Sequence, residues 1–280
     1  MFAPVVVDQW WALWEPMNRF EQQLARVSER TNRVIAQRWG KRFPFYYVSE
    51  FPRSGGTWFA HLLAHALEVP FPKNSRMPYA MECVLHLHWP YSPKYNRPFH
   101  VVRDGRDVAA SAWFYFKRSL VLDPTAVGSD AIRARHPELV DSPTAPAEAP
   151  EAFDRFVRTW LAQPLFVRSS WPVYVAQWTR DRENVHVVRY EDLLSDPVET
   201  LCQALGHVRE QPAADWIIEA AVAHYDFERQ TNRKPGEASP LEAKRSGTSG
   251  DWKNHFPDET RVHFHAVCGE TLSSLGYEVT

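Results

Sequence analysis

The fold is decided by one stretch, Phe45-Tyr46-Tyr47-Val48-Ser49-Glu50-Phe51-Pro52-Arg53-Ser54-Gly55-Gly56-Thr57-Trp58. Its first part, Phe45 to Val48, is aromatic and β-branched, which is typical of a buried strand. A glycine-containing turn follows, and an apolar segment from about Thr57 to Leu67 then predicts a helix. Strand, tight turn and helix in this order indicate an α/β fold with a parallel sheet.

The turn has the composition of a phosphate-binding loop. The paired glycines Gly55 and Gly56 let backbone N–H groups converge on an oxyanion, and the start of the helix contributes the positive end of its dipole. Thr57 adds a hydroxyl and Arg53 a positive charge. A Walker A loop would need four residues between its glycines and then Gly-Lys-Ser/Thr, so ordinary ATP use is disfavoured. For this heptapeptide alone, a plain glycine turn between strand and helix remains the alternative.

Two later apolar runs, Phe99 to Val102 and Val185 to Val188, also predict buried strands, each followed by a helical segment. Arg103 ends the first of them. Ser111 lies eight residues further on, about two helical turns beyond Arg103 and within the expected helix Val108 to Lys117, so its hydroxyl and Arg103 can share one phosphate. This edge of the sheet therefore has two phosphate-competent turns.

For Arg106 and Asp107, which follow Arg103 directly, we predict a structural role. Two adjacent charges at the start of a helix usually serve capping and local ion pairing.

Length and composition are those of one globular domain. The chain has 280 residues, and its net charge of -2 argues against nucleic-acid binding by bulk electrostatics. Cys83, Cys202 and Cys268 lack metal-ligand or redox spacing, so we predict no disulfide framework and a reducing, cytoplasmic compartment. The apolar run Phe2 to Val7 has no basic flank and no cleavage site, so we predict no signal peptide. No transmembrane segment is predicted either.

Within this single domain over residues 1–280, two segments stand apart. An amphipathic helix between Met17 and Trp39, ending at Gly40, makes residues 1–40 an N-terminal helical extension. Ser119 to Pro150 is rich in proline, alanine and acidic residues with little periodicity. There we expect a long surface loop or lid.

Four stretches, in the same order along the chain, resemble the sulfotransferases that use 3′-phosphoadenosine 5′-phosphosulfate (PAPS). Pro52–Trp58 resembles the 5′-phosphosulfate loop of that family, and Arg103–Ser111 resembles its 3′-phosphate strand-turn-helix. Trp171–Trp178 with Val185–Leu194 resembles the segments around its third strand, and Arg245–Asn254 resembles its Arg-Lys-Gly-x-x-Gly-Asp-Trp-Lys-Asn loop. The resemblance implies a three-layer, P-loop-like α/β domain with helices on both faces of a central parallel sheet. It also implies sulfuryl transfer from PAPS to a hydroxyl of a small molecule, leaving 3′-phosphoadenosine 5′-phosphate (PAP).

The resemblance further implies which residues bind the donor: Arg53, Ser54, Gly55, Gly56, Thr57, Trp58, Arg103, Ser111, Tyr190, Arg245 and Gly247. Those from 53 to 57 fall on the phosphosulfate, and Trp58 falls against adenine. Arg103, Ser111, Arg245 and Gly247 fall on the 3′-phosphate. Tyr190 falls near the base, although a tyrosine at the start of a helix can equally be a packing residue.

In-line attack of a hydroxyl on sulfur needs a base and a cation. Arg53 is the expected cation, which stabilises the leaving phosphate but cannot protonate it. His88-Trp89-Pro90 reproduces the His-x-Pro part of the family's Lys-Thr-His-x-Pro, and a histidine pKa near 6.5 suits a base, so His88 is favoured. His86, at the lysine position, and Glu82 are the alternatives, because some relatives that act on carbohydrates use a carboxylate.

We predict no metal site. His86 and His88 alternate with apolar residues, but no third ligand is near in sequence and this type of transfer needs no metal. Ser246 replaces the middle lysine of the carboxyl-terminal loop and Tyr174 replaces a histidine common in the family. Phe256–Asp258 interrupts a dimerisation pattern of some relatives, so we make no prediction of the oligomeric state.

Two other functions compete with this interpretation. A P-loop kinase or nucleotide hydrolase would need magnesium and a lysine-containing Walker loop. A catalytically silent nucleotide-binding protein on the same fold would not need Arg53, His88, Arg103 and Ser111, all of which are present.

The acceptor has no readable sequence code. Many aromatic residues favour an apolar or aromatic alcohol over a charged glycan, although aromatic residues also fill cores. They are Phe71, Tyr79, Trp89, Trp113, Phe114 and Tyr115.

Overall fold

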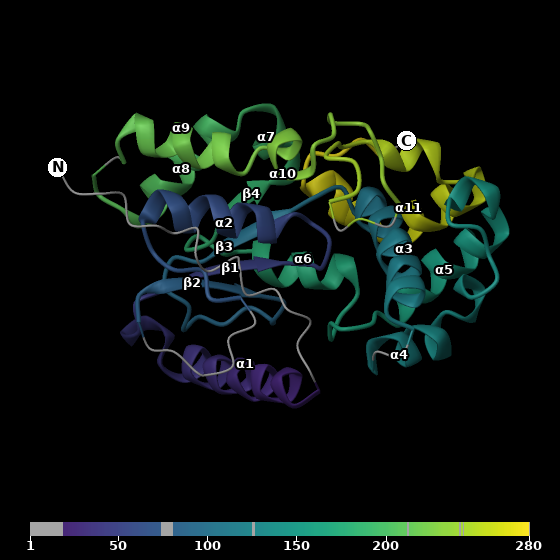
Figure 1. Ribbon diagram of the computed structural model, residues 1–280, viewed down its shortest axis with the longest axis horizontal. Coiled ribbons are helices and arrows are strands. Elements are labelled where there is room, and N and C mark those ends of the chain that lie inside the picture. The colour runs from purple at the N-terminus through teal and green to yellow at the C-terminus, as the bar shows by residue number, and fades with distance from the viewer. Residues whose placement is uncertain are drawn as a thin grey trace.

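The computed structural model describes residues 19–73, 81–124, 127–211, 213–240, 242 and 244–279. A sheet of four parallel strands in the order β2-β1-β3-β4 lies at its centre, with helices on both faces (Figure 1). The strands are β1 (Phe45–Glu50), β2 (Cys83–Leu87), β3 (Phe99–Val102) and β4 (His186–Arg189). The predicted α/β class with a central parallel sheet is confirmed.

Strand β2 is the one that the sequence analysis missed. Its residues Cys83, Leu85 and Leu87 face one core cluster and Val84 faces the other, so both faces of this short strand are buried. Such a strand lacks the polar-apolar alternation of a half-exposed strand, and a histidine among its five residues weakens the apolar signal further.

One face of the sheet is covered by α2 (Gly56–Leu67), α8 (Pro197–Val208) and α9 (Asp215–His224), and the short helix α7 (Tyr190–Ser195) leads from β4 into α8 (Figure 1). The core on this side includes apolar side chains of all four strands and of α2. They are Val48, Val84, Phe99, Val101, Val188, Phe59, Leu62 and Leu63. Because α2 starts immediately after the turn that follows β1, its amino terminus is anchored at the carboxyl edge of the sheet.

The other core is larger and aromatic, and it joins the opposite face of the sheet to α3 (Gly105–Leu122), α5 (Pro150–Ala162), α6 (Trp171–Thr179) and α11 (Asp258–Ser274). Its fully buried side chains include Tyr47, Trp113, Phe153, Phe156, Trp171, Trp178 and Phe264. Large rings bury much apolar area each, so this layer is a main source of stability.

The amino-terminal helix is confirmed as α1 (Arg19–Trp39), and it ends where Gly40 begins a 3-10 turn, η2 (Gly40–Arg42). A side chain on Gly40 would place its Cβ 2.7 Å from the carbonyl oxygen of Lys94, so the chain can turn there only with glycine. The apolar run Phe2 to Val7 lies outside the described residues.

The expectation of an irregular loop from Ser119 to Pro150 is wrong in part. Helix α3 continues to Leu122, and helix α4 (Val127–Arg135) and the 3-10 turns η3 (Pro137–Leu139) and η4 (Pro146–Glu148) follow. Ile132 and Leu139 are buried in the aromatic core, and the Lys117 ammonium donates to the Leu139 carbonyl oxygen at 2.6 Å. These anchors are too sparse in sequence to produce a periodic pattern, which explains the error.

The remaining elements are α10 (Phe227–Thr231), which precedes the carboxyl-terminal loop, and the 3-10 turn η5 (Asp251–Asn254), which forms the end of that loop. None of the helices among the described residues combines the length and apolar composition needed to cross a membrane.

Candidate functional site

The turn after β1 adopts a strained conformation. Arg53 has a positive φ of 81° and Gly55 one of 97°, and Gly55 caps the amino terminus of α2. A Cβ on Gly55 would also lie 2.5 Å from the ring of Tyr190. Gly55 is therefore required both for its backbone angle and for close packing against α7.

Arg53 points away from the turn toward α3. Its Nε–H donates to Ser111 Oγ at 3.1 Å, and its guanidinium lies 4.9 Å from the ring centroid of Tyr115. The strand order explains this contact, because β1 and β3 are neighbours and the turns at their carboxyl ends meet. The two phosphate-competent turns inferred from the sequence therefore meet in space.

Arg103 is buried beside them, 7% exposed. Its guanidinium stacks 4.3 Å from the ring centroid of Tyr190 and donates through Nη2 to the carbonyl oxygen of Thr248 at 3.0 Å. Burial alone would lower the pKa of Arg103, but Tyr190 and Asp107 outweigh it and raise the pKa. Its Nε–H is buried without a hydrogen-bond partner among the described residues, so one donor remains for an anion.

Asp107 ties the carboxyl-terminal loop to α3. Its carboxylate accepts the N–H groups of Gly250 at 2.6 Å and Trp252 at 2.8 Å, and it lies 3.8 Å from Arg103. Burial raises the pKa of Asp107, although Arg103 and the two N–H groups oppose the shift. The predicted pairing at the helix start is thus only part of its role, because Asp107 also anchors a segment more than a hundred residues away.

The prediction of local pairing holds for Arg106. Its guanidinium donates to both carboxylate oxygens of Asp104, at 2.7 Å from Nη2 to Oδ2, and stacks 3.9 Å from the ring centroid of Trp252.

In the carboxyl-terminal loop, the predicted residues Arg245 and Gly247 have structural partners. Arg245 pairs with Asp251 and lies 4.5 Å from the ring centroid of Phe114. Gly247 has a φ of 63°, and a Cβ there would lie 2.6 Å from the ring of Phe227. Because Arg103 binds the carbonyl of Thr248, the loop is held against the end of β3. The assignment of Arg245 and Gly247 to the donor stays a prediction.

Trp58 and Tyr190 pack against each other beside the turn. Their ring centroids are 6.0 Å apart in an edge-to-face arrangement, and the Trp58 indole N–H donates to the carbonyl oxygen of Tyr225 at 3.1 Å. Tyr190 is buried between Gly55 and Arg103, so it packs the turn whether or not it also contacts a base.

Lys73 is a cation near the turn that the sequence analysis did not select. Its ammonium donates to Thr57 Oγ1 at 3.3 Å. Ser54, one of the predicted donor residues, is 1% exposed beneath the same turn, and its N–H donates to the Phe51 carbonyl oxygen at 3.1 Å.

His86 and His88 lie at the carboxyl end of β2, with ring centroids 4.8 Å apart. The Nδ1–H of His88 donates to the backbone carbonyl oxygen of Glu50 at 3.0 Å, which leaves Nε2 as the acceptor nitrogen. Burial, followed by the charge of His86, lowers the pKa of His88 to about 4, although Glu50 opposes the shift. His88 is therefore neutral at neutral pH and able to accept a proton.

The loop that carries His88 is fixed by α6. The carbonyl oxygen of Trp89 accepts the hydroxyl of Tyr174 at 3.0 Å and the indole N–H of Trp178 at 3.1 Å. Tyr174, which stands where the family often has histidine, thus holds the backbone next to His88.

Glu50 is the site residue that the sequence analysis missed. It ends β1 and is 4% exposed, and its carboxylate accepts the Nε2–H of His86 at 2.9 Å and the N–H of Gly56 at 2.5 Å. Burial would raise its pKa, but the hydrogen bond and charge of His86, with smaller effects of His88 and Gly56, lower it to about 2. A glutamate directly before the turn was the only available sequence signal.

Glu82, the predicted alternative base, lies elsewhere. It precedes β2 at the amino end of the sheet, where it accepts the hydroxyl of Tyr46 at 2.7 Å. The carboxylate beside the histidines is that of Glu50.

Glu50, His86 and His88 also form a set of possible metal ligands, with ligand atoms within 4.8 Å of one another. The argument that no third ligand is near holds along the sequence but not in space. The absence of a metal stays a prediction.

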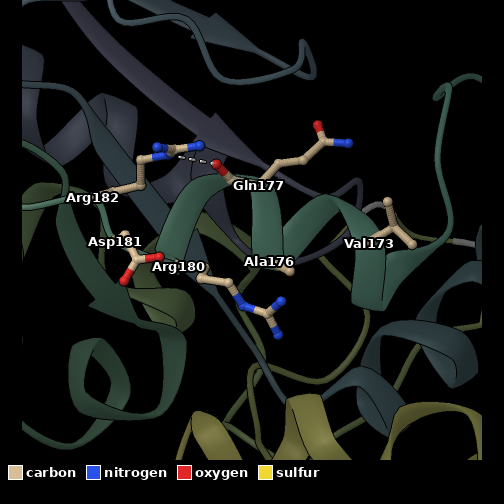
Figure 2. A pocket seen from close by; sticks show the side chains of 6 residues that line it. All are labelled: Val173, Ala176, Gln177, Arg180, Asp181 and Arg182. Carbon is tan, nitrogen blue, oxygen red and sulfur yellow. Dashed lines mark hydrogen bonds between the residues drawn. The ribbon is translucent and has the colours of Figure 1, made fainter.

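A shallow depression of about 340 Å³ lies on the outward face of α6 (Figure 2). Val173, Ala176 and Gln177 line it together with Arg180, Asp181 and Arg182. None of the predicted site residues belongs to it, so it does not bear on the site at the carboxyl edge of the sheet.

The aromatic residues proposed for an acceptor pocket divide into two groups. Trp89, Trp113 and Phe114 belong to the buried core, whereas Tyr115 lies under Arg53 and Phe71 lies 6.3 Å from His86 between ring centroids. Tyr79 lies outside the described residues. Only Phe71 and Tyr115 therefore support the inference of an apolar acceptor.

The sequence is similar to known sulfotransferases. The 3-alpha-hydroxysteroid sulfotransferase of Cavia porcellus is 31% identical over 138 residues, which are 45% of this chain and 47% of that protein. Sulfotransferase 2A1 of Homo sapiens is 23% identical over 194 residues, 64% of this chain and 58% of that protein. The chain thus spans about half the length of these relatives. Sulfotransferase 1E1 of Mus musculus is 21% identical over 262 residues, 78% of this chain and 79% of that protein.

Two solved structures share the fold. Mouse sulfotransferase SULT7A1 complexed with PAP has a TM-score of 0.60 and 16% identity, covering 90% of this chain and 92% of its own. Retinol dehydratase in complex with androsterone and the inactive cofactor PAP has a TM-score of 0.58 and 14% identity, covering 91% and 94%.

A family model described as the sulfotransferase domain matches residues 73–276, well over half of the chain. Since the order of the strands, the two turns at the carboxyl edge and this match agree, the chain belongs to the sulfotransferase domain family.

Proposed function

We propose that this chain transfers a sulfuryl group from PAPS to a hydroxyl of a small-molecule acceptor. The observation that carries the proposal is the meeting of Arg53, Ser111 and Arg103 at the carboxyl edge of the sheet, with the acceptor nitrogen of His88 at the neighbouring strand end. An anionic donor needs the positive charge and hydrogen-bond donors of the arginine and serine side chains, and a hydroxyl nucleophile needs the acceptor nitrogen of His88.

The donor assignment rests on local positive charge in a chain of nearly balanced net charge. Arg103 has one buried Nε–H without a partner among the described residues, and Ser111 already binds a guanidinium from the neighbouring turn. A 3′-phosphate between them would accept charge-assisted hydrogen bonds, the strongest type available to it. PAP in the solved structures of two fold relatives supports the same donor.

His88 acts as the base in this proposal. As the acceptor oxygen forms its bond to sulfur, Nε2 of His88 takes the hydroxyl proton, while Nδ1–H stays on the carbonyl of Glu50. The low pKa of His88 keeps the ring neutral before the reaction, and the developing imidazolium is stabilised by the Glu50 carboxylate.

Arg53 supports the leaving group. The bond between sulfur and the bridging oxygen breaks, and the electron pair remains on the 5′-phosphate, where a fixed positive charge is most effective. Arg53 lies on the same turn and keeps its charge throughout, so it stabilises this oxygen without protonating it.

The acceptor in this proposal is an apolar alcohol. Phe71 and Tyr115 offer apolar surface near the turn. One fold relative, retinol dehydratase, has been solved in a complex with retinol and PAP and in a second complex with androsterone and PAP. We also propose that residues 1–280 form one sulfotransferase domain and that the reaction needs no metal.

Ser111→Ala tests the donor assignment most cleanly, because it removes one hydroxyl and leaves the backbone of α3 unchanged. We expect PAP to bind at least about tenfold more weakly, since a hydrogen bond to a charged group contributes about 1.5–3 kcal/mol. Binding of adenosine 5′-phosphosulfate, which has no 3′-phosphate, should change by less than about twofold. Isothermal titration calorimetry measures both affinities.

Ser119→Ala is the matched control, because Ser119 lies two turns further along α3 and its hydroxyl donates to the Tyr115 carbonyl oxygen. It should bind PAP as the wild type does. Equal losses of both nucleotides in Ser111→Ala, or preferential binding of ATP with magnesium by the wild type, would contradict the assignment.

A further inference from the structure

Glu50 forms hydrogen bonds with three separate parts of the candidate site. Its two carboxylate oxygens accept the Nε2–H of His86 at 2.9 Å and the backbone N–H of Gly56 at 2.5 Å. Its carbonyl oxygen accepts the Nδ1–H of His88 at 3.0 Å. One nearly buried residue thus connects the carboxyl end of β2, where both histidines lie, to the first turn of α2.

The strand register produces this arrangement. In the parallel pair, Val48 lies opposite His86 and Ser49 opposite Leu87, so Glu50 is next to the residue that follows β2, which is His88. Side chains alternate along a strand, and Val48 faces the core under α2, so Glu50 and His86 point to that same face. The carboxylate therefore reaches the amino terminus of α2.

Gly56 shows that this position of Glu50 is built into the fold. Unlike Gly55, Gly56 is not among the residues with positive φ, so its backbone angle does not require glycine. A Cβ there would lie 2.8 Å from Cδ and 2.9 Å from Cγ of Glu50, closer than any ordinary contact. Glycine at this position leaves the volume that the Glu50 side chain occupies.

We propose that Glu50 is a positioning residue of the transfer reaction, which holds His86, His88 and the first turn of α2 as one unit, and that Gly56 is glycine to accommodate it. The proposal rests on the proposed function, because it assigns Glu50 a role through His88. Glu50 fixes which nitrogen of His88 is free, and its carboxylate stabilises the imidazolium that forms when His88 takes a proton.

The charge of Glu50 must be balanced, because an anionic donor would otherwise meet a carboxylate at the turn. His86 is the direct partner of the carboxylate, with Nε2 2.9 Å from the carboxylate oxygen. The charges of Arg53 and Lys73 at the same turn also attract the carboxylate.

Glu50→Gln is the central test, because glutamine keeps the volume and an acceptor oxygen but removes the charge. We expect kcat to fall at least about tenfold while the Kd of PAP changes by less than about threefold. The acid limb of the transfer rate should also move to lower pH, because the carboxylate favours the protonated form of His88. A merely structural role would lower the folded fraction without moving the pH profile.

Glu82→Gln is the matched control, a carboxylate beside the amino end of β2 with a single tyrosine partner. It should keep the wild-type kcat and pH profile. A Glu50→Gln enzyme with wild-type kcat and an unmoved acid limb would overturn the proposal.

A double-mutant cycle tests the pairing with Gly56. Gly56→Ala should lower kcat at least about tenfold in the wild-type chain but less than about threefold in the Glu50→Ala chain, where the space is free. Gly206→Ala, at a position of α8 where a Cβ meets nothing within 4 Å, is the control for adding a methyl group to a helix. An equal fall of kcat on Gly56→Ala in the wild-type and Glu50→Ala chains would refute the pairing of Glu50 with Gly56.

Failure of the proposed function would give a different result from failure of the role proposed for Glu50. A folded wild-type chain that binds PAP but transfers no sulfuryl group to any alcohol refutes the reaction, and with it the role of Glu50 in it. The same cycle read by thermal unfolding would then still show whether Glu50 and Gly56 are coupled.

Discussion

Replacing Asp107 by alanine should loosen the carboxyl-terminal loop at the candidate site. The Asp107 carboxylate is 2% exposed and accepts the N–H groups of Gly250 and Trp252, while Arg103 lies 3.8 Å away. Alanine leaves the buried N–H of Trp252 and the half-buried N–H of Gly250 without this acceptor, and the buried guanidinium of Arg103 without this carboxylate. The loop that contains Arg245 and Gly247 then loses its hydrogen bonds to the start of α3.

The structure sets the size of the effect. An unsatisfied buried donor costs about 1–3 kcal/mol, so the buried N–H of Trp252 and the half-buried N–H of Gly250 together should cost about 3 kcal/mol in the free energy of unfolding. With about 2–4 °C per kcal/mol for a domain of this size, Tm should fall by about 10 °C. Asparagine should cost about half as much, because its carbonyl oxygen still accepts one N–H and burial penalises the charge that it removes.

The assay combines thermal unfolding with PAP titration at a temperature where all variants are folded. Asp107→Ala should bind PAP at least about tenfold more weakly, because the loosened loop carries Arg245 and Gly247, which we predict to bind the 3′-phosphate. Asp130→Ala is the matched control, since Asp130 is also in the first turn of a helix but its pair with Arg133 is exposed. Such a surface pair contributes less than about 1 kcal/mol. An Asp107→Ala chain with wild-type Tm and PAP affinity would refute the reasoning.

Two further predictions concern the chemical step. His88→Ala should slow transfer by about a hundredfold or more with little change in PAP affinity, because it removes only the base. In the wild type, transfer should be flat near neutral pH and fall as pH drops toward about 4, where His88 takes up a proton and can no longer accept one. Steady-state rates from pH 4 to 8 check this, and a rate that rises on acidification would argue against a histidine base. Arg53→Ala should lower kcat far more than PAP affinity, because its charge matters most as the bridging oxygen becomes anionic, and an unchanged kcat would remove Arg53 from the mechanism.

Arg103 and Ser111 differ in how many structural contacts they make. Arg103→Ala would also test the 3′-phosphate assignment, but Arg103 holds Tyr190 and Thr248, so its loss would disturb packing as well as binding. Among the residues that the structure describes, the Ser111 hydroxyl has a hydrogen bond with Arg53 and no comparable structural contact, which makes Ser111 the better probe.

The sequence alone determined the features that depend on neighbouring residues. The glycine turn after β1, the bounds of β3 and the helix before Gly40 follow from local composition and periodicity, and the structure confirms them. The meeting of the two phosphate-competent turns also followed from the sequence, since parallel strands bring the turns at their carboxyl ends to one edge. The contact of Arg53 with Ser111 was found only in the structure.

Only the tertiary structure decided which distant residues share a space. The register of β1 against β2 places Glu50 beside the two histidines, whereas Glu82, which is nearer in sequence, lies at the opposite end of the sheet. In the same way, the packing of α3 against the carboxyl-terminal loop lets the Asp107 carboxylate accept the N–H of Gly250, which is far away in the sequence. The periodicity of apolar residues predicts which face of the sheet a side chain occupies. It does not predict which residue of the neighbouring strand lies opposite, because the register is set by how the whole sheet and its helices pack together.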